Sequence, residues 1–239
     1  MRILVTNDDG IESEGIRRLA AVASQFGEVI VAAPCDQCSA MSQKLTIFRE
    51  FEAKQTDLGI RGVKAYSVDG TPADCVKIAV HYLSDIMPDF LFSGINNGYN
   101  AGFDIAYSGT IGAAFEALQF GIPSIAFSKQ FGHDYSAVDI YIEQIANDLV
   151  SSPPPPGCLY NVNFPNCSPG EVQGILTGRS VAKTSYYIDN YSVTSPGPGI
   201  LSAKPGAVVV SPSDVDDGSD IDALFRNYIS VGIVKNPVL

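Results

Sequence analysis

Short apolar runs alternate with amphipathic segments along most of the chain. Residues 3–5 (ILV) lead directly into the polar sequence Asn7-Asp8-Asp9-Gly10, as expected where a buried strand enters a loop. Apolar residues then recur at helical spacing over 16–26, preceded by Ser13, which suits a helix N-cap. Residues 28–34 (EVIVAAP) predict a second strand. The N-terminus therefore predicts a βαβ unit with a right-handed crossover.

The same alternation continues to about residue 165. Helices are predicted over 72–83, 109–120 and 138–149, and strands over 89–95, 124–128 and 159–164. Four consecutive prolines at 153–156 end the last of these helices, because proline cannot continue one. We therefore predict an α/β fold with a mostly parallel sheet and helices on its faces.

The pattern changes in the last part of the chain, where short strand-like pieces are separated by Gly, Pro and Ser. We divide the chain into an α/β core, 1–165, and a β-rich C-terminal extension, 166–239, that belongs to the same domain. The edge strands of such an extension carry unpaired backbone N–H and C=O groups that must be covered by another element. Pairing with the same region of another subunit would provide that cover, so we expect a homo-oligomer.

Composition narrows the class of protein. The 239 residues are 46% hydrophobic and 17% charged, which suits a globular protein. A net charge of −11 disfavours stable binding to a nucleic-acid polymer. No run reaches the roughly 18 apolar residues of a membrane helix, and the N-terminus lacks a signal-peptide pattern. We expect a cytoplasmic protein with no membrane partner.

Polar side chains follow three of the predicted strands. Asp8 and Asp9 come after the first strand, Ser39 after the second, and Asn96 after the strand at 89–95. The carboxyl ends of parallel strands meet at one sheet edge, so these oxygens could together hold Mg²⁺, Mn²⁺ or Ca²⁺. Taken separately, Asp-Asp-Gly and the Ser and Asn clusters also suit ordinary turns.

Ser108-Gly109-Thr110 opens the predicted helix at 109–120. The free N–H groups of a helix N-terminus, with these hydroxyls, could bind a phosphate. An ordinary Ser cap explains the same residues. No lysine follows Gly112, so this is not a Walker A loop.

The histidines, the cysteines and the C-terminal aspartates do not form a recognisable catalytic or metal-binding motif. His81 and His133 have no metalloprotease spacing, and we expect Cys35 and Cys38 to be two unpaired thiols, with a redox-sensitive pair as the alternative. The aspartates between 214 and 222 do not fit a calcium loop, because the glycine falls one position early. We expect them to form a solvated acidic turn.

Several segments, taken together and in order, are specific to one family. They are Asn7-Asp8-Asp9-Gly10, Ala33-Pro34 with Ser39, Gly70-Thr71-Pro72-Ala73-Asp74, Ser93-Gly94-Ile95-Asn96, Tyr107-Ser108-Gly109-Thr110 and Asn161-Val162-Asn163. In these segments the chain resembles the stationary-phase survival protein SurE family of metal-dependent nucleotidases. The resemblance implies a Rossmann-like α/β domain and a C-terminal extension used in oligomers, either a homodimer or a homotetramer.

The resemblance also implies an activity and a site. The activity is hydrolysis of nucleoside monophosphates to nucleoside and phosphate by a 5'-nucleotidase, with 3'-nucleotidase and exopolyphosphatase activities as extensions. We predict one divalent ion, Mg²⁺ or Mn²⁺, and a non-catalytic, metal-dependent nucleotide sensor is the alternative function. The predicted site consists of the metal ligands Asp8, Asp9, Ser39 and Asn96, of which the two aspartates are catalytic, and of the substrate-binding residues Ser42, Asn100, Ser108, Gly109 and Thr110.

Overall fold

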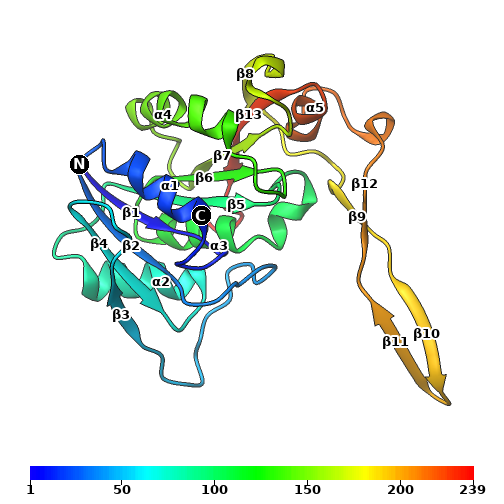
Figure 1. The fold of residues 1–239 in the computed structure, drawn as a ribbon, viewed down its shortest axis with the longest axis horizontal. Coiled ribbons are helices and arrows are strands. Elements are labelled where there is room, and N and C mark those ends of the chain that lie inside the picture. The colour runs from blue at the N-terminus through cyan, green and yellow to red at the C-terminus, as the bar shows by residue number, and fades with distance from the viewer.

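A nine-stranded sheet forms the centre of the computed structural model, which describes residues 1–239 (Figure 1). Across the sheet the strands are β3 (Ala53–Thr56), β4 (Val63–Val68), β2 (Glu28–Pro34), β1 (Arg2–Thr6), β5 (Phe90–Asn97), β6 (Ser124–Lys129), β7 (Cys158–Phe164), β13 (Tyr228–Lys235) and β8 (Gly174–Arg179). The strands from β4 to β7 are parallel, whereas β3 and β13 pair antiparallel with β4 and β7. The predicted mostly parallel α/β sheet is confirmed.

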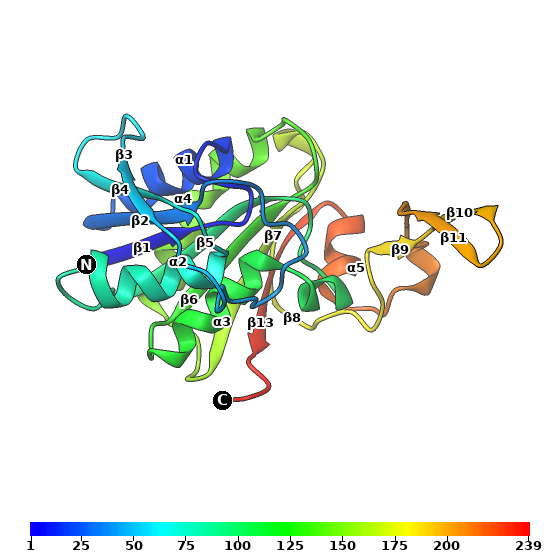
Figure 2. The same cartoon turned by 90° about the horizontal axis from the view of Figure 1, so that it is seen from below.

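Helices cover both faces of this sheet, as Figure 2 shows. Helices α1 (Glu14–Ala23) and α4 (Ser136–Ser151) pack on one face, in a core that includes Phe92 and Phe127. Helices α2 (Pro72–Ile78) and α3 (Gly109–Gln119) pack on the other. Helix α2 continues as a π-helical turn over Ala79–Leu83. None of the helices is both long and apolar enough to span a bilayer.

Local sequence accounts for where these helices begin. Ser13 caps α1 and accepts a hydrogen bond from the N–H of Ile16. Thr71 caps α2 in a capping box with Asp74. Ser108 caps α3, and its Oγ accepts from the N–H of Ile111 at 3.1 Å. Each cap follows a strand or its loop, so the N-termini of the helices face the carboxyl edge of the sheet.

The C-terminal part of the chain has two roles in the fold. Strands β8 and β13 extend the main sheet, and β13 pairs with β7 over six residues. Between them, residues 187–209 form an extended arm that projects away from the sheet (Figures 1 and 2). The arm contains β9 (Tyr187–Asp189), β10 (Ser192–Gly197), β11 (Ile200–Lys204) and β12 (Ala207–Val209), with β9 paired to β12 and β10 to β11.

The acidic segment at 214–222 differs from the expected solvated turn. Asp220 is buried and begins a short helix, α5 (Asp220–Phe225), behind the cap Ser219. Its carboxylate accepts hydrogen bonds from the N–H groups of Gly102, Ala182 and Ile221, at 2.8 to 3.0 Å. The prediction was wrong for Asp220, because these backbone donors, two of them remote in sequence, replace water around its carboxylate. Asp214 and Asp217 are exposed, as expected.

Candidate active site

Three loops meet at the carboxyl edge of the parallel strands. Asp8 and Asp9 leave β1 there, and the loop after β2 crosses beside them, with the N–H of Cys38 donating to the carbonyl of Asp8 at 2.7 Å. On the other side the end of β5 contributes the N–H of Asn97, which donates to Asp9 Oδ2 at 2.9 Å. The edge where an open α/β sheet binds its ligands thus carries two adjacent carboxylates.

Asp8 is the more enclosed of the two, with 3% of its surface exposed. Its Oδ1 accepts a 2.6 Å hydrogen bond from Thr110 Oγ1, in the first turn of α3. Gly109 lies against the same side chain, since a Cβ on Gly109 would stand 2.8 Å from Asp8 Cβ. Burial raises the pKa of Asp8 to about 6, because it disfavours the charged form; the Thr110 hydrogen bond opposes the rise and the charge of Asp9 adds to it.

Asp9 is half-buried, and neither aspartate is part of an ion pair. Two adjacent carboxylates without an ion-pair partner repel each other, and a divalent cation would relieve that repulsion. Asn96 donates through Nδ2 to the carbonyl of Gly98, so its Oδ1 is left as an acceptor. Ser39 is exposed on the neighbouring loop. Carboxylate, amide and hydroxyl oxygens are the donors that hard divalent cations prefer, so this set of residues fits such an ion.

Four of the five substrate-binding residues predicted from the sequence, Ser42, Ser108, Gly109 and Thr110, lie around the N-terminus of α3. Ser108 and Thr110 are buried there, and Ser108 Oγ uses only its acceptor side in capping the helix. Ser42 reaches the same place from the loop after β2, because its N–H donates to the carbonyl of Tyr107 at 2.9 Å. The carbonyl of Ser42 lies over Gly112, where an added Cβ would come within 2.2 Å of it.

Asn100 is also buried, but it lies in the loop after β5 and not at the N-terminus of α3. Its Nδ2 donates to Ser128 Oγ at 2.8 Å, and its backbone N–H donates to Asn163 Oδ1 at 3.0 Å. Its carbonyl accepts from the side-chain amides of Asn161 and Asn163. Asn100 therefore attaches the loop that follows β5 to strand β7. The two asparagines of the Asn161-Val162-Asn163 motif, in β7, make the hydrogen bonds that hold it.

Lys129, at the end of β6, belongs to the site although the sequence did not predict it. Its side chain is buried, and its ammonium donates to Asn97 Oδ1 and to the carbonyls of Gln130 and Gly132, at 2.6 to 3.0 Å. Burial lowers the pKa of Lys129, while nearby carboxylates, Asp9 among them, oppose that fall. Lys129 thus supports Asn97, whose N–H orients Asp9. A charged residue at the end of an otherwise apolar strand was the only available signal.

The remaining candidates lie outside this cluster. His81 is exposed and contacts the ring of Phe120 edge-on. His133 is exposed in the loop after β6. Cys35 is exposed and Cys38 is buried, and burial is the first cause that raises the pKa of each thiol. Neither thiol has the lowered pKa of a reactive cysteine.

Fold and site together define an α/β protein with a doubly covered parallel sheet and an oxygen-rich acidic site at its carboxyl edge. A family model described as "Survival protein SurE" matches residues 3–186 of the chain. The chain is 39% identical over 237 residues to a Thermus thermophilus protein named "5'-nucleotidase SurE 1", covering 97% of this chain and 90% of that protein. It is 35% identical over 238 residues to a Clostridium botulinum protein named "5'-nucleotidase SurE", covering 97% and 91%.

A solved structure of a SurE protein also matches the fold of this chain. The SurE protein from Aquifex aeolicus superposes with a TM-score of 0.82 at 31% identity, covering 98% of this chain and 93% of that one. The chain therefore belongs to the SurE family.

Proposed function

We propose that this chain is a metal-dependent nucleotidase that hydrolyses nucleoside monophosphates to nucleoside and phosphate, acting as a 5'-nucleotidase. The observation that carries the proposal is the pair Asp8 and Asp9, which lies beside the N-terminus of α3 with no cationic side chain in an ion pair with it. The printed names of the relatives from Thermus thermophilus and Clostridium botulinum support the same activity.

The residues that would hold the metal are Asp8, Asp9, Ser39 and Asn96, and the ion is Mg²⁺ or Mn²⁺. When bound, such an ion supplies positive charge to a phosphate and lowers the pKa of a coordinated water. The chain contributes the geometry around it. Thr110 fixes the carboxylate of Asp8 through a 2.6 Å hydrogen bond, and the N–H of Asn97 fixes that of Asp9.

The N-terminus of α3 binds the phosphoryl group of the substrate. The first N–H groups of a helix have no partner within it and favour anions. The hydroxyl proton of Ser108 remains free to donate to a phosphoryl oxygen, because its oxygen caps the helix as an acceptor. Asp9, which is less buried than Asp8, accepts the proton of the attacking water. Hydrolysis then needs no covalent intermediate on the protein.

Phosphate release tests this function. The substrates are 5'- and 3'-nucleoside monophosphates and inorganic polyphosphate, each with Mg²⁺ or Mn²⁺. We expect release from the 5'-monophosphates that stops in excess chelator and in Asp9→Asn, and that persists in Asp85→Asn, an exposed carboxylate outside the site. Metal-dependent nucleotide binding without release would instead establish a sensor. Full turnover in chelator would refute the metal requirement.

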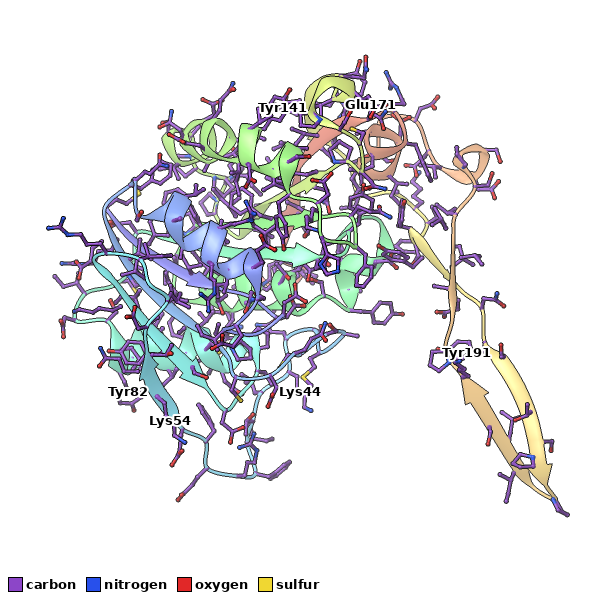
Figure 3. All side chains as sticks on the ribbon, viewed as in Figure 1. Lys44, Lys54, Tyr82, Tyr141, Glu171 and Tyr191 are labelled. Carbon is purple, nitrogen blue, oxygen red and sulfur yellow. The ribbon has the colours of Figure 1, made fainter.

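The arm is the part of the chain that we propose to join copies in a homodimer or homotetramer. It exposes apolar side chains at Ile188, Tyr191, Val193, Ile200, Leu201, Val208 and Val209, and Figure 3 shows Tyr191 well clear of the sheet. A two-stranded hairpin alone is marginally stable in water, so it needs a surface to pack on. Light scattering should give a multiple of the 25.4 kDa chain mass, and Leu201→Asp should lower it; a monomer at micromolar concentration would refute this assignment.

A further inference from the structure

The segment that carries Ser39 and Ser42 has a strained backbone. Ala40 and Ser42 have φ angles of 57° and 51°, and Asn227 is the only other non-glycine residue with a positive φ. The left-handed region brings Cβ close to the following carbonyl oxygen, so alanine and serine stay there only when surrounding contacts hold them. Two such residues directly after a predicted metal ligand therefore need an anchor outside the segment.

Gln43 provides a side-chain anchor for this segment. Its Nε2 donates to Glu116 Oε2, in the second half of α3, at 2.8 Å. Gln43 directly follows Ser42, whose N–H donates to the carbonyl of Tyr107 just before α3. The segment is thus attached to the start of α3 and again about two turns further along it. Figure 3 marks Lys44, the next residue of the loop, at the surface.

Glu116 is a buried carboxylate that the proposed reaction does not use. It is 1% exposed, and its Oε1 pairs with Lys77 Nζ of α2 at 2.9 Å. Its Oε2 accepts from Gln43 and, at 3.4 Å, from Gln119 in the same helix. A buried carboxylate is costly unless its oxygens have partners, and a hydrogen bond to a charged group is stronger than a neutral one. The bond to Gln43 is therefore of the kind that holds a strained backbone in place.

We propose that Glu116 is a positioning residue of the active site, which acts through Gln43 to hold Ser39 and Ser42. The inference rests on the proposed nucleotidase function, in which Ser39 is a metal ligand, and on the prediction that Ser42 binds substrate. The first turn of α3 holds Asp8, so this one helix positions both the aspartate and the serines. Without the Gln43 bond, the segment returns to ordinary backbone angles and Ser39 moves away from the metal site.

Calorimetric titration of Mn²⁺ into the metal-free protein tests this role, together with KM for AMP, a 5'-nucleoside monophosphate. Gln43→Ala should raise Kd for Mn²⁺ and KM about tenfold each, the value of one hydrogen bond to a charged group. Gln119→Ala is the matched control, because it removes an amide from the same Glu116 oxygen without touching the loop. It should leave both constants unchanged.

A strain-relieving substitution gives a second test. Glycine adopts positive φ freely, so Ala40→Gly added to Gln43→Ala should recover about fivefold in Kd and KM. Glu116→Ala should reproduce the effect of Gln43→Ala, and the two together should add nothing, since both remove the same bond. If Glu116→Ala does not fold, Gln43→Ala and Gln119→Ala decide the matter. A merely structural role would lower the urea midpoint of Gln43→Ala without changing Kd or KM.

The outcomes separate this proposal from the proposed function. If the wild type binds Mn²⁺ but hydrolyses no nucleotide, a weaker Mn²⁺ affinity in Gln43→Ala alone keeps the positioning role while the hydrolytic function fails. If the wild type is an active metal-dependent nucleotidase and Gln43→Ala keeps its Kd and KM, the function stands and the positioning role is overturned. Equal effects of Gln43→Ala and Gln119→Ala, no recovery with Ala40→Gly, or no Mn²⁺ binding by the wild type would also overturn it.

Discussion

Asp8→Asn should make the metal-free protein more stable at high pH while abolishing its activity. Burial raises the pKa of Asp8 from 3.8 to about 6, so ionised Asp8 is disfavoured in the folded state. A carboxyl group whose pKa is higher in the folded than in the unfolded state stabilises the fold only at low pH. The stabilisation from Asp8 is therefore fully present below about pH 4 and is lost as the pH rises through 6. The shift of roughly two pKa units, at 1.36 kcal/mol each, costs about 3 kcal/mol at pH 8.

Asn keeps the shape of the side chain and the oxygen that accepts from Thr110, but it cannot ionise. Urea denaturation in chelator at pH 5 and pH 8 therefore separates the charge from the packing. We expect Asp8→Asn to gain about 3 kcal/mol over the wild type at pH 8 and roughly half of that at pH 5. Asp85→Asn, on an exposed carboxylate, should track the wild type. An Asp8→Asn protein that is equally or less stable than the wild type at both pH values would refute the reasoning.

Three further substitutions test the packing around the site and its supports. Gly109→Ala places a methyl group 2.8 Å from Asp8 Cβ. We expect this substitution to lower kcat about 100-fold, because it displaces the Asp8 carboxylate. The control Gly170→Ala, with no atom within 4 Å of the added Cβ, should leave kcat unchanged. Lys129→Met removes the charged donor from three acceptors, so urea denaturation should show a loss of about 3 kcal/mol; an unchanged midpoint would contradict its supporting role. Asp220→Ala leaves three N–H groups without their acceptor, and thermal unfolding should show a similar loss, while a loss below about 1 kcal/mol would mean that water replaces the carboxylate.

The parallel core could be predicted from the sequence because its strands are buried on both faces. Residues 29–34 and 125–127 are continuous apolar runs, and they form the interiors of β2 and β6, whose bounds match the expected ones to within one residue. Strands β3 and β4 had no such signal. The first is only four residues long, lies at the edge of the sheet and has no buried residue, and the second has only two buried residues, Ala65 and Val68. Their sequences resemble polar loops when their partners are unknown.

The sequence could predict those residues of the candidate site that directly follow a parallel strand. Asp8, Asp9 and Asn96 follow from the rule that parallel strands end at one edge, and the structure places the loops that carry them within hydrogen-bonding distance of each other. Their roles as ligands and catalysts remain predictions. Lys129 and Asp220 could not be found in this way, because their burial depends on donors and acceptors up to 118 residues away.

The attachment of Asn100 gives a glycine-rich loop the rigidity of a strand. Loops of this composition normally exchange their amide hydrogens with solvent within seconds, since local opening costs them little. Here the N–H of Asn100 is buried against Asn163 Oδ1, and its carbonyl is held by two side-chain amides. Opening that hydrogen bond requires β7 to separate from the loop, so the Asn100 amide should exchange as slowly as those of the central strands. The timescale on which this loop moves is then that of global unfolding.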